Sequence, residues 1–354
     1  MKEVLTRWYQ RYLSEEEPVV LLVLLLAAFV VMLAFGEILA PVFVAVILAY
    51  LMQGVANVMR HRGLPAELSV AISTLLFLGA FLAVLFGLAP LVWRQLVALV
   101  REAPTMIEAG RQVLVTLPEE YPVLFTQQQI NELTSVIQAE MATMGQLLVT
   151  KGLSSIPSML ALLVYLILIP LMVFFFLKDR DQLIGWFAGF LPAKRPLLDR
   201  IWGELNQQFA NYARGKGIEI LIIGGASYLV FALFSLNYAA LLGLLVGLSV
   251  IVPYIGATLV TIPVVVVAYA QFGVSPDFYW VVGAYIVIQV LDGNVLVPLL
   301  FSEAVNLHPV AIVIAVLFFG GLWGLWGVFF AIPLATLVNA ILTAWPSPEA
   351  LSHP

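Results

Sequence analysis

The sequence predicts an all-α polytopic membrane protein of about eight transmembrane helices, with interrupted helices in its C-terminal half. Hydrophobic residues make up 62% of its 354 residues, against roughly 45–50% in an average soluble domain, and charged residues only 10%. The mean hydropathy is +1.05. No lysine or arginine follows Lys216, so lipid rather than water must surround most of residues 217–354.

The chain opens with a short amphipathic stretch, residues 1–13. Trp8, Tyr9 and Tyr12 recur there at helical spacing, which predicts an interfacial helix with its aromatic rings at headgroup level. Apolar segments follow that are long enough for a hydrocarbon core of about 30 Å, which needs about 20 helical residues. The predicted spans are 18–36, 38–58, 68–93, 153–177, 218–236, 239–272, 278–301 and 308–341.

These spans divide the chain into successive regions. The two longest, 239–272 and 308–341, could each cross the membrane once or re-enter, and length leaves both alternatives open. The predicted regions are 1–93 (the amphipathic helix and three spans), 94–152 (a periplasmic helical hairpin), 153–177 (the fourth span), 178–217 (a cytoplasmic, basic, amphipathic segment), 218–341 (a C-terminal membrane core) and 342–354 (a cytoplasmic tail).

The basic residues predict the orientation, because cytoplasmic loops of membrane proteins carry an excess of lysine and arginine. With a cytoplasmic N-terminus, twelve bases fall on the cytoplasmic side. Only four fall on the opposite side: Arg94, Arg101, Arg111 and Lys151. Eight crossings then leave both termini in the cytoplasm.

The hairpin 94–152 contains a heptad-like seam from Ile130 to Leu148, which predicts a helix with one apolar face. Two alternatives stand for this face: packing against residues 96–117, or contact with an oligomer subunit or a partner. No sequence feature demonstrates a homo-oligomer, although one would suit a helix-rich membrane protein.

Several functional classes are excluded or disfavoured. The chain has no cysteine, which excludes disulfides, thiolate metal sites and cysteine nucleophiles. No G-x-x-x-x-G-K-[ST] motif occurs, so the chain carries no ATPase domain of its own. The few, scattered bases do not indicate nucleic-acid binding. We expect no enzyme, cofactor or resident metal; the expected partners are the lipid bilayer and a small solute or monovalent cation.

Asp292 is the best candidate for a functional residue, because an ionisable group inside a span costs about 2.5–3.5 kcal/mol on insertion scales. Gln289 lies one turn earlier on the same helical face, and Asn294 follows closely. Gly293 permits local unwinding that would free backbone carbonyls, so the group predicts a cation or proton site. The alternative is that Asp292 and Asn294 are structural hydrogen-bonding residues between helices.

A second candidate is the break at Pro253, Tyr254 and Gly256. Proline cannot donate the helical hydrogen bond and glycine admits unusual conformations, so together they predict an interrupted helix facing Asp292. The glycines of 320–327 are interpreted as helix-packing residues. The remaining intramembrane acids, Glu37, Glu219 and Glu303, lie nearer predicted span ends, so we expect a solvated or interfacial role for them.

Seven motifs recur in order along the chain. They are Pro170–Asp179 (PLMVFFFLKD), Tyr212–Lys216 (YARGK), Ile251–Gly256 (IVPYIG), Asp292–Pro298 (DGNVLVP), Val305–Pro309 (VNLHP), Gly320–Gly327 (GGLWGLWG) and Ala331–Pro333 (AIP). In this combination the chain resembles the autoinducer-2 exporter family, and within it the PerM-type permeases. The resemblance implies a bacterial inner-membrane protein with about eight spans that exports a solute or, for some members, exchanges sodium for protons. It also implies that a glutamate is frequent where this chain has Asp292.

The predicted function is therefore that of an inner-membrane secondary transporter, which exports a small solute or exchanges cations through a site near Asp292. The alternative from another class is a membrane scaffold that transports nothing and binds an envelope partner through the hairpin 94–152.

Overall fold

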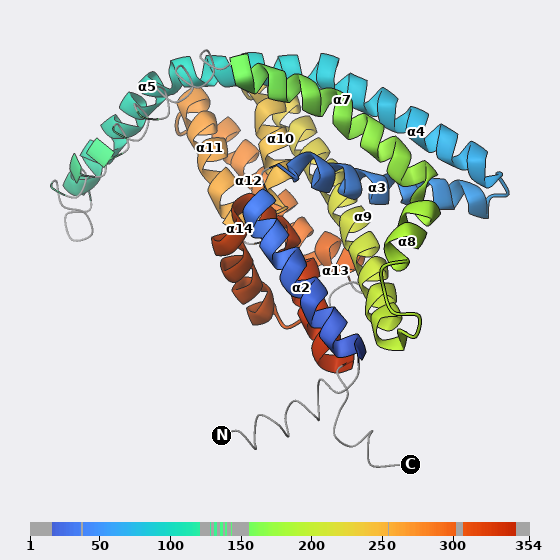
Figure 1. Cartoon of the computed structure of the whole chain (residues 1–354). Helices are drawn as coiled ribbons and strands as arrows, with labels where there is room; N and C mark the ends of the chain where they lie inside the picture. The colour runs from blue at the N-terminus through green and yellow to red at the C-terminus, as the bar shows by residue number, and fades with distance from the viewer. Residues whose placement is uncertain are drawn as a thin grey trace, which may run out of the picture. The chain divides into compact units, whose positions relative to one another are not determined.

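The computed structural model describes residues 16–36, 38–120, 128, 131, 132, 135, 136, 139, 143, 156–253, 255–301 and 307–344. Within these residues every regular element is a helix, which confirms the predicted all-α class (Figure 1). The predicted helix 1–13 and the seam residues from Ile130 to Leu148 lie outside the described residues.

The helices follow one another along the chain with few long connections. They are α2 (Glu16–Phe35), α3 (Ala40–His61), α4 (Ala66–Ala83), the π-helix η1 (Val84–Leu88), α5 (Ala89–Glu120), α7 (Ile156–Lys178), α8 (Arg180–Ala188), α9 (Pro196–Leu233), α10 (Ala239–Ser249), α11 (Ile255–Phe272), α12 (Pro276–Leu291), the π-helix η2 (Asp292–Leu296), α13 (Val297–Phe301) and α14 (Pro309–Ala344).

Six helical segments in the described part of the chain are long and apolar enough to cross a membrane. A seventh is obtained if α7 and α8, which meet at 78°, count as one bent span. Large apolar side chains such as Leu162, Ile167 and Leu221 lie on the outer surface of these helices. In water such a surface would be unfavourable, whereas in a bilayer it contacts lipid.

The chain forms two compact units, which are described separately. Unit 1 comprises Met1–Leu78, Ile167–Ile218 and Val297–Pro354, and unit 2 comprises Gly79–Leu166 and Glu219–Leu296.

In unit 2, α10 and α11 form an antiparallel hairpin (Figure 1). At its open end the backbone N–H of Asn237 donates to Oε1 of Gln271 at 2.7 Å. At its tip a Cβ on Gly256 would collide with the carbonyl oxygen of Ser249, so the chain reverses between these two residues. With 11 residues, α10 is only about 16 Å long, too short to cross a core of about 30 Å. Segment 239–272 therefore returns to the side from which it starts.

The hairpin packs on the second half of α9 through glycines. A Cβ on Gly247 would lie 2.9 Å from Cα of Gly224, and a Cβ on Gly243 would lie 2.9 Å from the backbone nitrogen of Tyr228. Small residues allow such close backbone contact between membrane helices. The core of unit 2 gathers around fully buried Phe231, with side chains of α9, α10, α11 and α12.

In unit 1, α14 also reverses direction. Gly324 has φ 59° and ψ −137°, a conformation that essentially only glycine adopts. A Cβ on Gly327 would collide with the carbonyl oxygen of Phe319, and Ala315 packs in one cluster with Ala331. Segment 308–341 is thus a helical hairpin with its turn at Gly324, and the glycines of 320–327 serve both the turn and close packing.

The second arm of α14 lies along α2. Leu21 of α2 packs in a cluster with Leu337 and Ile341, and a Cβ on Gly36 would collide with the indole of Trp323. Near the start of α9, the guanidinium of Arg195 pairs with the Asp199 carboxylate at 3.0 Å. A backbone N–H at the same end, that of Leu197, donates to Glu17 Oε2 at 3.1 Å, which anchors α2 to α9.

Candidate functional site

Asp292 stands where α12 changes into the π-helix η2. Single π-helical turns are rare and occur frequently at functional sites. The residue is only 9% exposed, whereas its neighbours Leu291 and Gly293 are exposed. The helix begins with Pro276 after the N-cap Ser275, whose Oγ accepts from the backbone N–H of Phe278 at 3.4 Å. The local sequence therefore sets the start of the helix that carries this carboxylate.

Asp292 continues a line of polar side chains along the buried face of α12. Tyr285, Gln289 and Asp292 follow at intervals of four and three residues, which places them on one face. Tyr285 is 1% exposed. Nε2 of Gln289 is buried and has no hydrogen-bond partner among the described residues. We call these three residues the α12 polar line.

Tyr285 of the α12 polar line contacts the first turns of α11. The hydroxyl oxygens of Tyr285 and Thr261 are 2.8 Å apart. Either hydroxyl can be the donor between the two, and Thr261 also donates to the carbonyl of Ala257 at 2.7 Å. The same hydroxyl lies 3.5 Å from the Ala257 carbonyl oxygen. The start of α11 thus supplies oxygen atoms beside Tyr285.

The predicted break of the long segment is present just before Ala257. Helix α10 ends at Ser249 and α11 begins at Ile255, with Pro253 between them. Gly256 is required here by the close approach to Ser249. Tyr254 lies outside the described residues. The break therefore leads directly into the part of α11 that contacts Tyr285. The first contact after the break is that of the Ala257 carbonyl oxygen with the Tyr285 hydroxyl.

Asn294 lies apart from the other predicted residues. It is exposed, and its Nδ2 donates to the backbone carbonyl of Val290 at 2.9 Å. The structure therefore brings Gln289 and Asp292 onto one buried face, while Asn294 lies on the exposed surface of the same helix.

At its open end, the α10–α11 hairpin is attached to α5. The hydroxyl of Tyr238 donates to Oε2 of Glu102 at 2.6 Å, and Oε1 of Gln95 accepts from the backbone N–H of Leu241 at 2.8 Å. The second bond caps the N-terminus of α10 with a side chain from another helix. Burial, together with the hydrogen bond to Glu102 and its negative charge, raises the pKa of Tyr238 to about 12.

Comparison with known proteins identifies the family. The family model described as AI-2E family transporter matches residues 20–347. The chain belongs to this family. It is 46% identical over 346 residues to a protein of Escherichia coli (strain K12) named as a permease, PerM, covering 98% of both chains. It is 26% identical over 305 residues to a Bacillus subtilis (strain 168) protein named as a transport protein, YueF, covering 85% of this chain and 82% of that one.

In this member of the AI-2E transporter family, two further buried polar residues were not predicted as site residues. Glu219, in the second half of α9, was expected to be solvated or interfacial; it is 1% exposed, so it is not solvated. Tyr212, Lys216 and Glu219 follow one another at intervals of four and three residues, and this spacing could have indicated a shared buried face. Lys216 is 5% exposed, and its Nζ lies 5.1 Å from the centre of the Phe301 ring, a cation–π contact.

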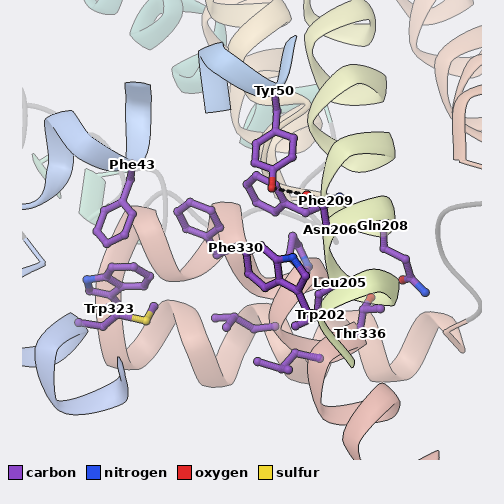
Figure 2. Close-up of a pocket in the computed structure, with 14 residues that line it drawn as sticks. Phe43, Tyr50, Trp202, Leu205, Asn206, Gln208, Phe209, Trp323, Phe330 and Thr336 are labelled. Carbon is purple, nitrogen blue, oxygen red and sulfur yellow. Dashed lines mark hydrogen bonds between the residues drawn. The ribbon is translucent and has the colours of Figure 1, made fainter. Parts of the chain in front are cut away.

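Unit 1 of this AI-2E family member also holds a cavity of about 270 Å³ between α2, α3, α9 and α14 (Figure 2). Six of its lining residues are aromatic, and the hydroxyl of one of them, Tyr50, donates to Oδ1 of Asn206 at 2.7 Å. No sequence motif had pointed to this cavity, because its lining residues come from four separate helices.

Proposed function

We propose that this AI-2E family transporter is a secondary transporter of the bacterial inner membrane that couples the movement of a monovalent cation or small solute to protonation of Asp292. The observation that carries the proposal is the burial of Asp292 at a π-helical turn, in line with Tyr285 and Gln289. The similarity to proteins named as permeases and transport proteins supports the transport class.

The chemistry of coupling follows from the electrostatics of a buried carboxyl group. Burial in a low-dielectric environment favours the neutral form, whereas a nearby cation favours the ionised form. Asp292 would therefore release a proton when a cation arrives and take one up when the cation leaves. The neutral oxygens of Gln289, Tyr285 and Thr261 suit sodium better than a soft metal.

The α10–α11 hairpin adds a route for the ion. A hairpin tip within the membrane exposes backbone groups that are tolerated only where protein or water lines the gap. Interrupted helices of this kind bind substrate and coupling ions in several transporter folds. On this proposal the carbonyl of Ala257 at the start of α11 and the carboxylate of Asp292 face the same permeation path.

Replacement of Asp292 tests the proposal. The protein is reconstituted in proteoliposomes, and proton flux driven by gradients of sodium, potassium and a panel of small solutes is measured. We expect Asp292→Asn to abolish coupled flux, because an amide cannot release a proton, and Asp292→Glu to retain part of it. Gln289→Leu should lower the rate about tenfold, equivalent to about 1.4 kcal/mol, the order of one hydrogen bond.

Asp277→Asn is the matched control, because Asp277 lies exposed in the first turn of the same helix. It should transport as the unmodified protein does. If Asp292→Asn transports normally while remaining folded, Asp292 is a structural residue and ion coupling at this site is refuted. The scaffold alternative predicts a different result. The protein would then show no flux under any gradient, and its hairpin 94–152 would bind an envelope protein.

A further inference from the structure

Helix α8 turns sharply away from α7 where the apolar part of α7 ends. The two helices meet at 78°, and in Figure 1 α8 runs from the end of α7 toward the start of α9. The last turns of α7 expose apolar side chains, such as Leu171 and Phe175, which contact lipid in a bilayer. The charged residues Arg180 and Asp181 at the start of α8 are costly in the hydrocarbon core. This helix therefore runs along the membrane–water interface beside the end of α7.

Three large aromatic side chains at the end of α8 are exposed, and we call them the aromatic cluster. Trp186 is 61%, Phe187 64% and Phe190 72% exposed. The indole of Trp186 packs edge-on against the rings of Phe187 and Phe190, at 4.8 and 5.0 Å between centroids. Such a surface is unfavourable in water, whereas aromatic side chains are enriched where a membrane meets water.

The backbone that carries the aromatic cluster is held by hydrogen bonds within unit 1. Nη1 of Arg195 donates to the carbonyl oxygen of Ala188 at 2.6 Å, and the same guanidinium pairs with the Asp199 carboxylate. The backbone N–H of Phe190 donates to the carbonyl of Phe187 at 3.1 Å. The end of α8 is thus tied to the start of α9, and the rings project from an ordered backbone.

Basic residues stand on both sides of the aromatic cluster along the chain. Residues 178–195 contain four bases and two acids. Arg180 pairs with Asp181 at 3.6 Å, whereas Lys178 and Lys194 are exposed and form no ion pair among the described residues. A base close to a membrane surface attracts anionic lipid, and raises its local concentration about fivefold.

We propose that the aromatic cluster, Lys178 and Lys194 form a surface that binds anionic phospholipids at the place where α7 leaves the bilayer. The rings insert between the headgroups, and the two lysines contact their phosphates. Lipid is the partner because this surface continues the lipid-facing side of α7, and anionic lipid because exposed bases without acidic partners flank the rings. The surface belongs to unit 1 and does not depend on the proposed role of Asp292.

A fluorescent label on α8 tests what this surface faces. Because the chain has no cysteine, Gly185→Cys can be labelled selectively with nitrobenzoxadiazole. Gly185 is exposed beside Trp186, and a Cβ there meets no atom within 4 Å. The full-length protein is placed in nanodiscs of phosphatidylcholine and phosphatidylglycerol. One of the two lipids carries a quenching doxyl group close to its headgroup, at equal mole fraction in either case, and iodide serves as the quencher from water.

We expect both doxyl lipids to quench the label at position 185, with an apparent local concentration of phosphatidylglycerol about fivefold higher at low salt. Lys178→Gln combined with Lys194→Gln should remove this preference. Arg200→Gln is the matched control, because Arg200 is exposed on α9, outside the proposed surface, and should leave the preference unchanged.

Gly203→Cys is the matched control for the label. Gly203 is also exposed, a Cβ there also has open space, and it lies one turn from exposed Arg200 and Gln207 on a polar face of α9. A label there should be quenched by iodide and not by the doxyl lipids. Trp186→Ala combined with Phe190→Ala should reduce lipid quenching at position 185 and admit iodide, with the thermal unfolding temperature retained.

Three results would overturn the proposal. Quenching at position 185 by iodide but not by lipid would show that the aromatic cluster faces water, and protection from both quenchers would show that protein covers it. Equal quenching by the two doxyl lipids, or a preference that survives the loss of both lysines, would refute the binding of anionic lipid by this surface.

Discussion

The hydroxyl of Tyr238 holds the open end of the α10–α11 hairpin to Glu102 of α5. We predict that Tyr238→Phe destabilises the protein by about 1 kcal/mol, the usual contribution of one hydrogen bond. Because the pKa of Tyr238 is raised from 10.0 to about 12, the neutral form is favoured in the folded state. The contribution is therefore fully present below pH 10 and is lost as the pH rises toward 12.

Thermal unfolding in detergent across this pH range measures the effect. Tyr279→Phe is the control, because Tyr279 is 62% exposed and should tolerate the change. A difference between wild type and Tyr238→Phe that disappears well below pH 10 would contradict the assigned hydrogen bond.

At the residue scale, the sequence identified those residues that differ in chemistry from their neighbours along the chain. Asp292 is conspicuous as an acid within an apolar run, and its burial agrees with that reason for choosing it. Tyr285 and Thr261 escaped notice, because tyrosine and threonine are common in membrane helices and only their 2.8 Å contact distinguishes them. Glu219 was expected to be solvated or interfacial because it stands at the start of the predicted span 218–236, whereas α9 is one helix from Pro196 to Leu233.

At the scale of elements, the sequence predicted the interruption at Pro253 and Gly256 but not the reversal of the chain. Proline and glycine report locally that a helix ends. The direction taken afterwards depends on contacts between distant residues, such as the bond between Asn237 and Gln271. For the same reason the glycine-rich, apolar sequence of 308–341 could not reveal a hairpin, although Gly324 supplies the conformation that it needs.

The hairpin makes a topological prediction that a single crossing does not share. The chain has no cysteine, so single cysteines can be introduced without background labelling. We expect Asn237→Cys and Val274→Cys to react with a membrane-impermeant maleimide from the same side, the periplasmic one, because they flank the two ends of the hairpin. Lys194→Cys should react only after the membrane is permeabilised. Labelling of positions 237 and 274 from opposite sides would mean that segment 239–272 crosses the membrane.

At the scale of the whole chain, charge and hairpins together determine the sidedness of the termini. All bases precede residue 217, so the positive-inside rule orients the first half of the chain only. Each C-terminal hairpin returns to the side on which it starts. The remaining predicted spans number six, which is even, so the C-terminus should lie on the same side as the N-terminus, as eight crossings also required.

The orientation can be tested with a reporter that is active only in the periplasm. Fused after Gln128, it should be active, because residues 94–152 hold only four of the sixteen bases. Fused after Lys194, it should be inactive, because the positive-inside rule retains the basic segment 178–217 in the cytoplasm. Fused at the C-terminus, it should also be inactive, because spans 218–236 and 278–301 cross the membrane and return, and neither hairpin changes the side. Substituting Arg60 and Arg62 with Gln should weaken the bias and yield a mixed signal at Gln128. An active reporter after Lys194 together with an inactive one after Gln128 would mean that the chain has the opposite orientation in the membrane. An ion would then reach Asp292 from the opposite side.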